Sequence, residues 1–160
     1  MHEFAGRPRM RDMVLALRLF RYFRYAWAIP YTLLGLLVGG VAVLLGATLR
    51  RHHGVIEIYG GHLGAAVARL PRLLNFSAMT LGHVILAVDH SAMAQLRRHE
   101  HVHVRQYERW GPLFVPAYLL SSLVQLLRGR NPYRENHFER QAYALAPSRR
   151  RVPATDGQRR

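Results

Sequence analysis

The sequence predicts an α+β fold that is mainly helical, with one N-terminal transmembrane helix and a small domain after it. Three observations support this prediction. Residues 26–49 carry no charged side chain, and an apolar run of about 20 residues is long enough to cross a bilayer as a helix. Two later stretches, 54–63 and 78–88, have the alternation or the composition of strands. Residues 92–110 repeat apolar side chains at the spacing of an amphipathic helix.

The composition is strongly basic, and this limits the expected partners. The chain of 160 residues has 23 basic side chains, all of them arginine, against 9 acidic ones. Such a charge suits an anionic membrane surface or a nucleic acid. The arginines flank the apolar segments, and no aromatic-basic sheet signature or helix-turn-helix is found. The lipid bilayer is therefore the expected partner, and no nucleic acid is expected. There is no cysteine, so any metal ion must be bound by His, Asp or Glu.

The segment before the apolar run, residues 1–25, predicts the orientation in the membrane. It contains six arginines, whereas Arg50 and Arg51 alone follow the run closely. Since the more basic flank of a span stays in the cytoplasm, we expect a single-span protein of the cytoplasmic (inner) membrane with its main domain outside the cytoplasm. In the alternative, the run bends at Gly39-Gly40 and returns without crossing, which leaves the whole protein on the cytoplasmic side.

Residues 50–146 are expected to form the main domain, and local signals divide them into short elements. Glycines and prolines end the helices, and Asp89 or Ser91 can cap the helix that carries the main motif. The tail, 147–160, is polar and lacks apolar periodicity, so it is predicted to be disordered. The expected elements are strands within 54–63 and 78–88 and helical stretches within 62–74, 92–110, 112–127 and 134–146.

The most informative motif is "HEHVH" at residues 99–103. On a helix, His99, Glu100 and His103 fall on the face of the large apolar side chains, whereas His101 falls on the other face with the arginines. Histidines four residues apart can bind one zinc ion, and the glutamate beside the first can act as general base toward a water on the metal. The pattern therefore predicts Zn²⁺ bound by His99 and His103, with Glu100 as the catalytic base.

A catalytic zinc site needs a third protein ligand and one open position. Among the acidic residues downstream, Glu108 falls on the wrong face of the helix, and Asp156 is in the tail. Glu139 falls on the inward face of its helix and is the predicted third ligand, with Glu135, one turn earlier, as the runner-up. The alternative role of Glu139 is an ion pair with a nearby arginine.

Three further features have weaker signals. Tyr107 lies one turn after His103 on the same face; it is a weak catalytic candidate that would steady an oxyanion, and packing is the alternative. His83 lies on a strand that leads into the site helix, where an edge strand would pair with a peptide substrate; a hydrogen-bonded core histidine is the alternative. The apolar stretch 112–127 separates two predicted ligands. It is therefore expected to pack on the site helix or lie in the membrane interface without crossing.

The order of these motifs resembles that of gluzincin-type membrane metallopeptidases of the CAAX-protease and HtpX kind. In that pattern E-x-x-A-D follows H-E-x-x-H after an apolar segment, and here "ERQAY" at 139–143 has Tyr in place of Asp. "AMTLGHVILAV" with "LRRHEHVHVRQ" is similar to a metallopeptidase domain of bacterial contractile-injection-system proteins. "RHEHVHVRQYERWGPLFVPAYL" and "NHFERQAYA" resemble small, uncharacterised bacterial membrane proteins over residues 26–146. His137 and Gln141 stand where that pattern has Pro and Glu.

The resemblance implies a zincin-like metallopeptidase domain over 50–146, anchored in a bacterial inner membrane. Its expected activity is the hydrolysis of peptide bonds in a protein or peptide substrate by a zinc-activated water. Two alternatives stay open at this point. One is a non-catalytic membrane scaffold with a structural zinc site, and the other, with less support, is an arginine-rich nucleic-acid binder.

Overall fold

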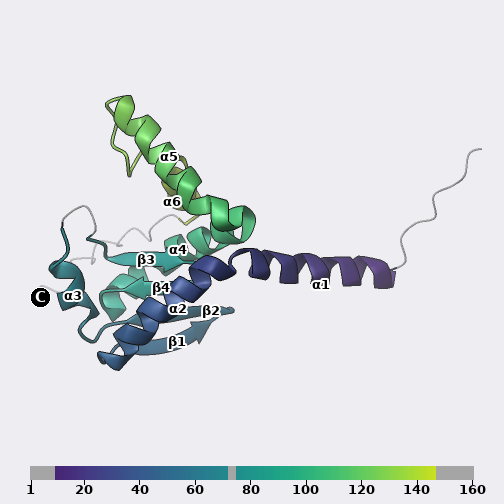
Figure 1. Cartoon of the computed structure of the whole chain (residues 1–160), viewed down its shortest axis with the longest axis horizontal. Helices are drawn as coiled ribbons and strands as arrows, with labels where there is room; N and C mark the ends of the chain where they lie inside the picture. The colour runs from purple at the N-terminus through teal and green to yellow at the C-terminus, as the bar shows by residue number, and fades with distance from the viewer. Residues whose placement is uncertain (1–9, 72–74, 147–160) are drawn as a thin grey trace, which may run out of the picture.

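A computed structural model describes residues 10–71 and 75–146 of the chain. A four-stranded sheet lies at its centre, with helices packed on both faces (Figure 1). The strand order is β1-β2-β4-β3; β2 and β4 are parallel, and the two outer pairs are antiparallel, so β1 and β3 are the edge strands. The strands are β1 (Thr48–His52), β2 (Val55–Tyr59), β3 (Ala78–Leu81) and β4 (Val84–Ala87).

Side chains of the sheet alternate between two cores, one under each layer of helix. The first core contains Ile58 and Leu86 and is covered by helix α2 (Ile29–Leu44). The second contains Ile85 and is covered by helix α4 (His90–Trp110). Because α4 carries the H-E-x-x-H motif, the packing of α4 on the second core fixes the position of the candidate site relative to the sheet.

The other helices extend from these two layers. Helix α1 leads into α2, and α3 follows β2. At the end of α4 a short 3-10 turn, η2, leads into α5, which projects away from the sheet (Figure 1). The chain then turns back, and α6 packs on α4 and α5. These elements are α1 (Met10–Trp27), α3 (Leu63–Ala68), η2 (Gly111–Leu113), α5 (Phe114–Leu127) and α6 (His137–Leu145).

The observed elements confirm the predicted class, a mixed α+β fold that is mainly helical. The helix predicted over 92–110 is α4, which begins two residues earlier. Of the two predicted caps, Asp89 performs the role: its carboxylate accepts a hydrogen bond from the backbone N–H of Ala92 at 2.8 Å. The helix predicted over 134–146 is the shorter α6, because Asn136 caps it two residues later.

The prediction of a single strand over 78–88 was wrong, because this stretch is a hairpin of two strands. The stretch 78–88 forms the separate strands β3 and β4, because the chain turns at Gly82, whose φ of 60° lies in the left-handed region that favours glycine. The turn leaves β3 at the edge of the sheet, beside α4. The predicted disordered tail, 147–160, and residues 1–9 of the basic segment lie outside the described residues.

The predicted transmembrane helix over 26–49 is not supported. That run is divided between the end of α1, helix α2 and the start of β1. Helix α2 also packs tightly on the sheet, since a Cβ added to Gly35 would lie 2.8 Å from the backbone oxygen of Leu81. If α2 crossed a bilayer in this arrangement, the open edges of the sheet would enter the hydrocarbon with it, and their unpaired backbone groups would be very costly there.

By length and composition, one helical stretch of the described chain is apolar enough to cross a membrane: His90–Leu127. It is not N-terminal, and it comprises α4, η2 and α5. Its α4 part lies against the sheet, so the free apolar surface belongs to α5. Phe114, in the first turn of α5, packs on Tyr107 of α4 with 4.3 Å between the ring centroids. The apolar stretch therefore contacts the site helix at its start and leaves its later turns exposed.

Candidate metal centre

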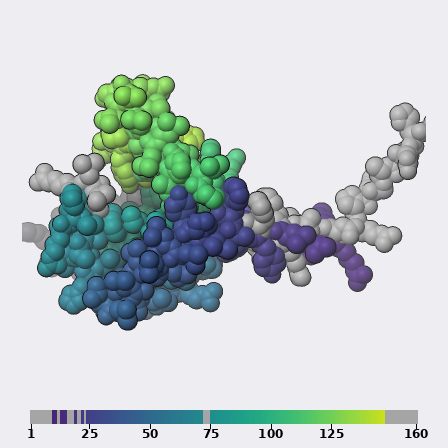
Figure 2. Space-filling model, viewed as in Figure 1, coloured from purple at the N-terminus to yellow at the C-terminus, as the bar shows by residue number. Residues whose placement is uncertain are grey.

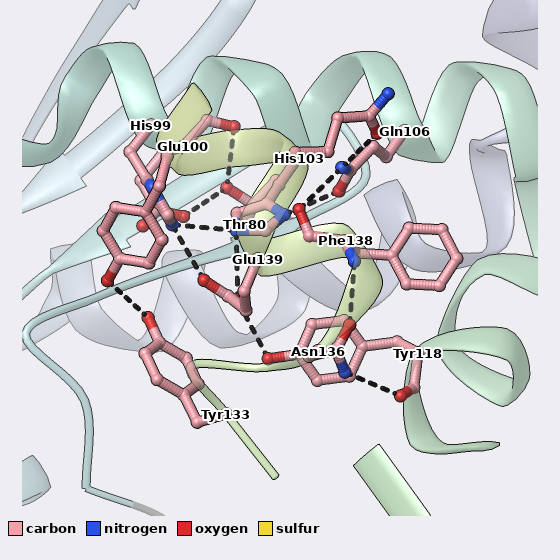
Figure 3. Close-up of polar contacts among 12 residues, drawn as sticks. Thr80, His99, Glu100, His103, Gln106, Tyr118, Tyr133, Asn136, Phe138 and Glu139 are labelled. Carbon is pink, nitrogen blue, oxygen red and sulfur yellow. Dashed lines mark hydrogen bonds and ion pairs between the residues drawn. The ribbon is translucent and has the colours of Figure 1, made fainter. Parts of the chain in front are cut away.

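Three predicted ligands come together where α6 packs against α4 (Figure 3). His99 and His103 lie one turn apart on α4, and their Nε2 atoms are 3.1 Å apart. The carboxylate of Glu139, from α6, has Oε2 at 3.2 Å from Nε2 of His99 and Oε1 at 3.4 Å from Nε2 of His103. Two ligands of a tetrahedral site with metal–ligand distances of about 2.0–2.1 Å lie about 3.3 Å apart. One donor atom from each of the three residues lies within 4.8 Å of the other two, so the group is compact enough to share one metal ion.

The burial of these three side chains affects the pKa values of the group. His99, His103 and Glu139 are each less than 8% exposed, so their charges are poorly solvated. Burial alone would raise the pKa of Glu139, but the polar contacts with the His103 and His99 imidazoles lower it to about 2. Conversely, burial would lower the pKa of His103, and the contact with Glu139 raises it instead. The carboxylate is thus ionised at neutral pH and ready to bind a cation.

Gln106 orients the second histidine for metal binding. Its amide nitrogen donates to the backbone oxygen of Phe138 at 3.0 Å and to the side-chain oxygen of Gln141 at 2.8 Å. Its amide oxygen therefore faces Nδ1 of His103, 2.8 Å away, and must accept the proton on that nitrogen. This places the free lone pair of His103 on Nε2, toward His99 and Glu139. Such outer contacts fix the tautomer of a ligand histidine.

Two side chains outside α4 position Glu139. The hydroxyl of Tyr118, from α5, donates to Oε1 of Glu139 at 2.8 Å. Asn136 caps α6 by accepting from the backbone N–H of Phe138 at 2.9 Å, and its amide nitrogen donates to the backbone oxygen of Tyr118 at 2.9 Å. The cap therefore joins the start of α6 to α5. Oε2 of Glu139 is buried and has no hydrogen-bond partner among the described residues, which leaves it available to a cation.

Glu100 lies beside the three donors and is also buried. Burial raises its pKa above the ordinary value, and the nearby His103 and a hydrogen bond from Thr80 partly oppose this increase. The hydroxyl of Thr80 donates to Oε2 of Glu100 at 2.7 Å. Since Thr80 lies on the edge strand β3, the sheet fixes the carboxylate that the motif predicts as the general base. A carboxylate with a raised pKa is suited to accept a proton near neutral pH.

The other predicted site residues lie apart from this centre. Glu135, the runner-up ligand, is partly exposed and lies 4.0 Å from Arg140 in an ion pair. Tyr107 packs between the rings of Tyr31 and Phe114, and burial raises its pKa far above the usual range. These contacts agree with the packing role of Tyr107 that the sequence left open.

One expectation about the other faces of α4 needs correction. His101 does not point outward with the arginines; it is half-buried and lies 3.6 Å from the carboxylate of Glu57 on β2. Glu108 lies outside the group of three ligands, and its carboxylate contacts Arg24 at 2.6 Å and His83 at 3.3 Å. His83 itself is a buried, hydrogen-bonded residue of the β3–β4 turn, which was the alternative role expected for it. Helix α4 is thus buried on more than one side.

Aromatic side chains cover the centre on its outer side. The ring of Tyr143 lies on that of His99, with 4.5 Å between centroids, and its hydroxyl is 3.5 Å from that of Tyr133. Both tyrosines are nearly half exposed. A cavity of about 410 Å³ lies between α5 and the outer face of α6, and its lining includes none of the three donors. The outer side of the centre is therefore covered by two partly exposed tyrosines and is not lined by this cavity.

Sequence reasoning missed the residues that support the centre. Gln106 was detectable, because it lies three residues after His103 and so on the same side of α4. Asn136 carries a local signal too, since Asn three residues before Glu is typical of a helix start. Thr80 and Tyr118 have no such signal, because their positions depend on how β3 and α5 pack.

Comparisons with models of protein families, with curated proteins and with solved structures find no match to this chain. The resemblance to metallopeptidases thus stays an expectation, and function must be argued from the geometry of the centre.

Proposed function

We propose that this protein is a membrane-associated, zinc-dependent peptidase whose metal ion is bound by His99, His103 and Glu139. The observation that carries the proposal is the buried group of two imidazoles and one carboxylate, with contacts of 3.1–3.4 Å between its members, beside the second buried carboxylate of Glu100. Two imidazoles and one carboxylate form a ligand set common in catalytic zinc sites, where a fourth position stays open. Zinc is the ion that this ligand set favours.

Bound zinc supplies two things: it lowers the pKa of a water molecule and polarises a carbonyl group. The chain supplies the rest of the chemistry. Glu100 accepts the proton of the attacking water and then delivers it to the leaving amine, as a general base and acid. Thr80 holds the Glu100 carboxylate during this transfer through the 2.7 Å hydrogen bond. Gln106 holds His103 in the tautomer that the metal requires.

The position of β3 supports a peptide as the substrate. Strand β3 pairs with β4 on one side and is the sheet edge on the other, and it carries Thr80. An edge strand presents unpaired backbone groups, and an extended peptide can add to it as a further strand. A peptide bound in this way would run past Glu100. The sequence assigned the pairing with a peptide substrate to the strand that contains His83. In this proposal β3 has that role.

A second candidate function is favoured by one observation, the enclosure of the centre. Each donor is less than 8% exposed, and the ring of Tyr143 lies over His99. Structural zinc sites are closed, whereas catalytic ones keep an open position. In this alternative the protein is a non-catalytic membrane scaffold, and zinc joins α4 to α6. The two candidates share the ligands and differ in the role of Glu100.

The test compares metal content with hydrolysis in matched variants. We expect His99→Ala and Glu139→Gln to lose the zinc ion of this centre, together with activity toward a library of unstructured peptides. Glu100→Gln should keep that zinc ion and lose hydrolysis, and the partly exposed Glu135→Gln is the control that should keep both. If the wild type binds zinc and hydrolyses no peptide, and chelation lowers its melting temperature, the structural role replaces the catalytic one. Loss of zinc in Glu100→Gln would refute the assignment of roles.

Association with the membrane is proposed from the outward faces of two helices. Helix α2 turns its small residues toward the sheet, and its large ones outward: Leu37 is 68% exposed and Leu44 is 87% exposed. Helix α5 likewise exposes Leu127 at 78%. Figure 2 shows α2 and α5 on one face of the molecule. Neither helix carries a charged side chain, and exposed apolar surface of this extent indicates a membrane or protein interface.

We infer that α2 and α5 lie in the membrane interface rather than span the bilayer. Arginines follow both helices, Arg50 and Arg51 after α2 and Arg128 after α5, and these favour a leaflet with anionic lipids. The predicted outward orientation of the domain required a crossing. In an interfacial arrangement the N-terminus and the domain share one side, which was the alternative interpretation of the sequence.

Vesicle flotation tests this arrangement. The wild-type protein should float with vesicles of mixed neutral and anionic lipids, whereas Leu37→Glu and Leu127→Glu should stay in solution. Gln95→Glu, an exposed change on α4 away from both helices, is the control that should float. Reporter tags at the two termini should show the same sidedness in spheroplasts. Tags on opposite sides would refute the interfacial arrangement and restore a crossing.

A further inference from the structure

A second group of metal-ligating side chains lies on another side of α4, away from Glu139. It consists of His52 on the edge strand β1, Glu57 on β2 and His101 on α4, and one donor atom from each lies within 4.8 Å of the others. In the pairing of β1 with β2, His52 is opposite Val55, and Val55 packs in the core under α4. His52 therefore points to the same side of the sheet as Glu57, toward α4.

One ring nitrogen of His101 is buried without a hydrogen bond. This atom, Nε2, has no hydrogen-bond partner among the described residues. The nearest carboxylate oxygen, Oε1 of Glu57, is 3.6 Å away, which is too long for a hydrogen bond. The distance is close to the edge of about 3.3 Å expected between two ligands of one tetrahedral zinc ion. A cation between the two atoms would satisfy both.

The charge of Glu57 is already balanced in part, because Arg97 pairs with it. The guanidinium donates to both carboxylate oxygens, at 2.8 and 2.9 Å. Each oxygen of a carboxylate has two lone pairs, so Arg97 leaves one on each oxygen free. Glu57 is 1% exposed, whereas the side chain of Arg97 is 33% exposed. Arg97 can therefore move into solvent more easily than Glu57, which lowers the cost of placing a cation beside the carboxylate.

We propose that His52, Glu57 and His101 form a second metal site, for a borderline divalent ion such as Zn²⁺ or Cu²⁺. Imidazole ligands favour such ions over Mg²⁺ or Ca²⁺. The three histidines of "HEHVH" then belong to two metal sites. His99 and His103 bind the ion next to α6, and His101 binds the ion at the edge of the sheet. The site links the β1–β2 hairpin to α4. This inference is independent of the proposed peptidase function, since it requires neither Glu139 nor catalysis.

Zinc stoichiometry in the full-length protein tests the proposal. Equilibrium dialysis against buffered Zn²⁺ should give two zinc ions per chain for the wild type and one for His52→Ala or His101→Ala. His62→Ala changes an exposed histidine outside both groups and is the matched control, which should keep two. His99→Ala should keep one ion, so failure of the first centre and failure of the second are separately visible.

A spectroscopic readout locates the second ion even if one variant folds poorly. In the His99→Ala background, one equivalent of Cu²⁺ should give an electron paramagnetic resonance spectrum with coupling to two imidazole nitrogens. His101→Gln, which keeps a side chain of similar size, should remove one of those couplings. A single zinc ion in the wild type that is lost in His99→Ala would overturn the proposal, and so would an unchanged stoichiometry in both His52→Ala and His101→Ala.

Discussion

Two glycines of α2 provide a quantitative test of how this helix packs. A Cβ on Gly35 would lie 2.8 Å from both the backbone oxygen of Leu81 and Cβ of Val84, and neither atom can move away easily. A Cβ on Gly40 would meet nothing within 4 Å. Both substitutions to alanine gain the same helix propensity, about 1 kcal/mol. Overpacking typically costs about 1–3 kcal/mol, so Gly35→Ala should be less stable than Gly40→Ala by about that amount.

Thermal unfolding of the two variants in the same detergent or lipid measures this difference. For a domain of this size about 1 kcal/mol corresponds to a shift of about 2–4 °C in Tm. Gly35→Ala should therefore melt roughly 2–12 °C below Gly40→Ala, and Gly40→Ala should melt at or slightly above the wild type. Equal melting temperatures would show that α2 is not packed on the sheet. The reasoning against a free transmembrane helix would then be wrong.

Three further predictions concern the metal centre. Gln106→Met, which removes the acceptor for Nδ1 of His103, should weaken zinc binding by about 10–100-fold in competition with a chelator; unchanged affinity would contradict the tautomer argument. Thr80→Val should raise the pKa of Glu100 further and move the acidic limb of the kcat/KM profile to higher pH, whereas Thr80→Ser should not. Because the folded-state pKa of Glu139 is about 2 against an ordinary 4.5, Glu139 contributes stability above pH 4.5 that is lost as the pH falls toward 2. In chelator, Glu139→Gln should show a weaker acid dependence of unfolding than the wild type.

The sequence identified those parts of the fold and site that depend on local periodicity. The helix over 92–110 and the inward side of His99, Glu100 and His103 follow from a repeat of 3.6 residues and were predictable. The same argument on a shorter helix put both Glu139 and Glu135 on the inward face, with Glu139 as the predicted ligand and Glu135 as the runner-up. The structure brings the first of these carboxylates to the histidines and leaves the second near solvent.

Features that depend on packing between distant segments were not predictable in this way. A single inward face was assigned to α4, but the helix packs against the sheet on one side and α6 on another. His101 therefore lies against Glu57, where one-sided periodicity placed it in solvent. The turn at Gly82 was missed because the residues on both sides of it favour strands; its φ of 60° and the close approach of Thr32, which together require glycine there, depend on the folded structure.

Helix α2 illustrates why hydropathy alone does not determine how an apolar helix is placed. A run without charges predicts an apolar environment on all sides, but it does not tell which side is protein and which is lipid. The small residues carry that information: Gly35, Gly39 and Ala42 recur at helical spacing and are all buried. Small side chains let a helix approach a sheet or another helix closely. In a water-soluble protein the large apolar residues would make this contact; in α2 they point away, as Leu37 does, which is the arrangement expected when the outer solvent is lipid.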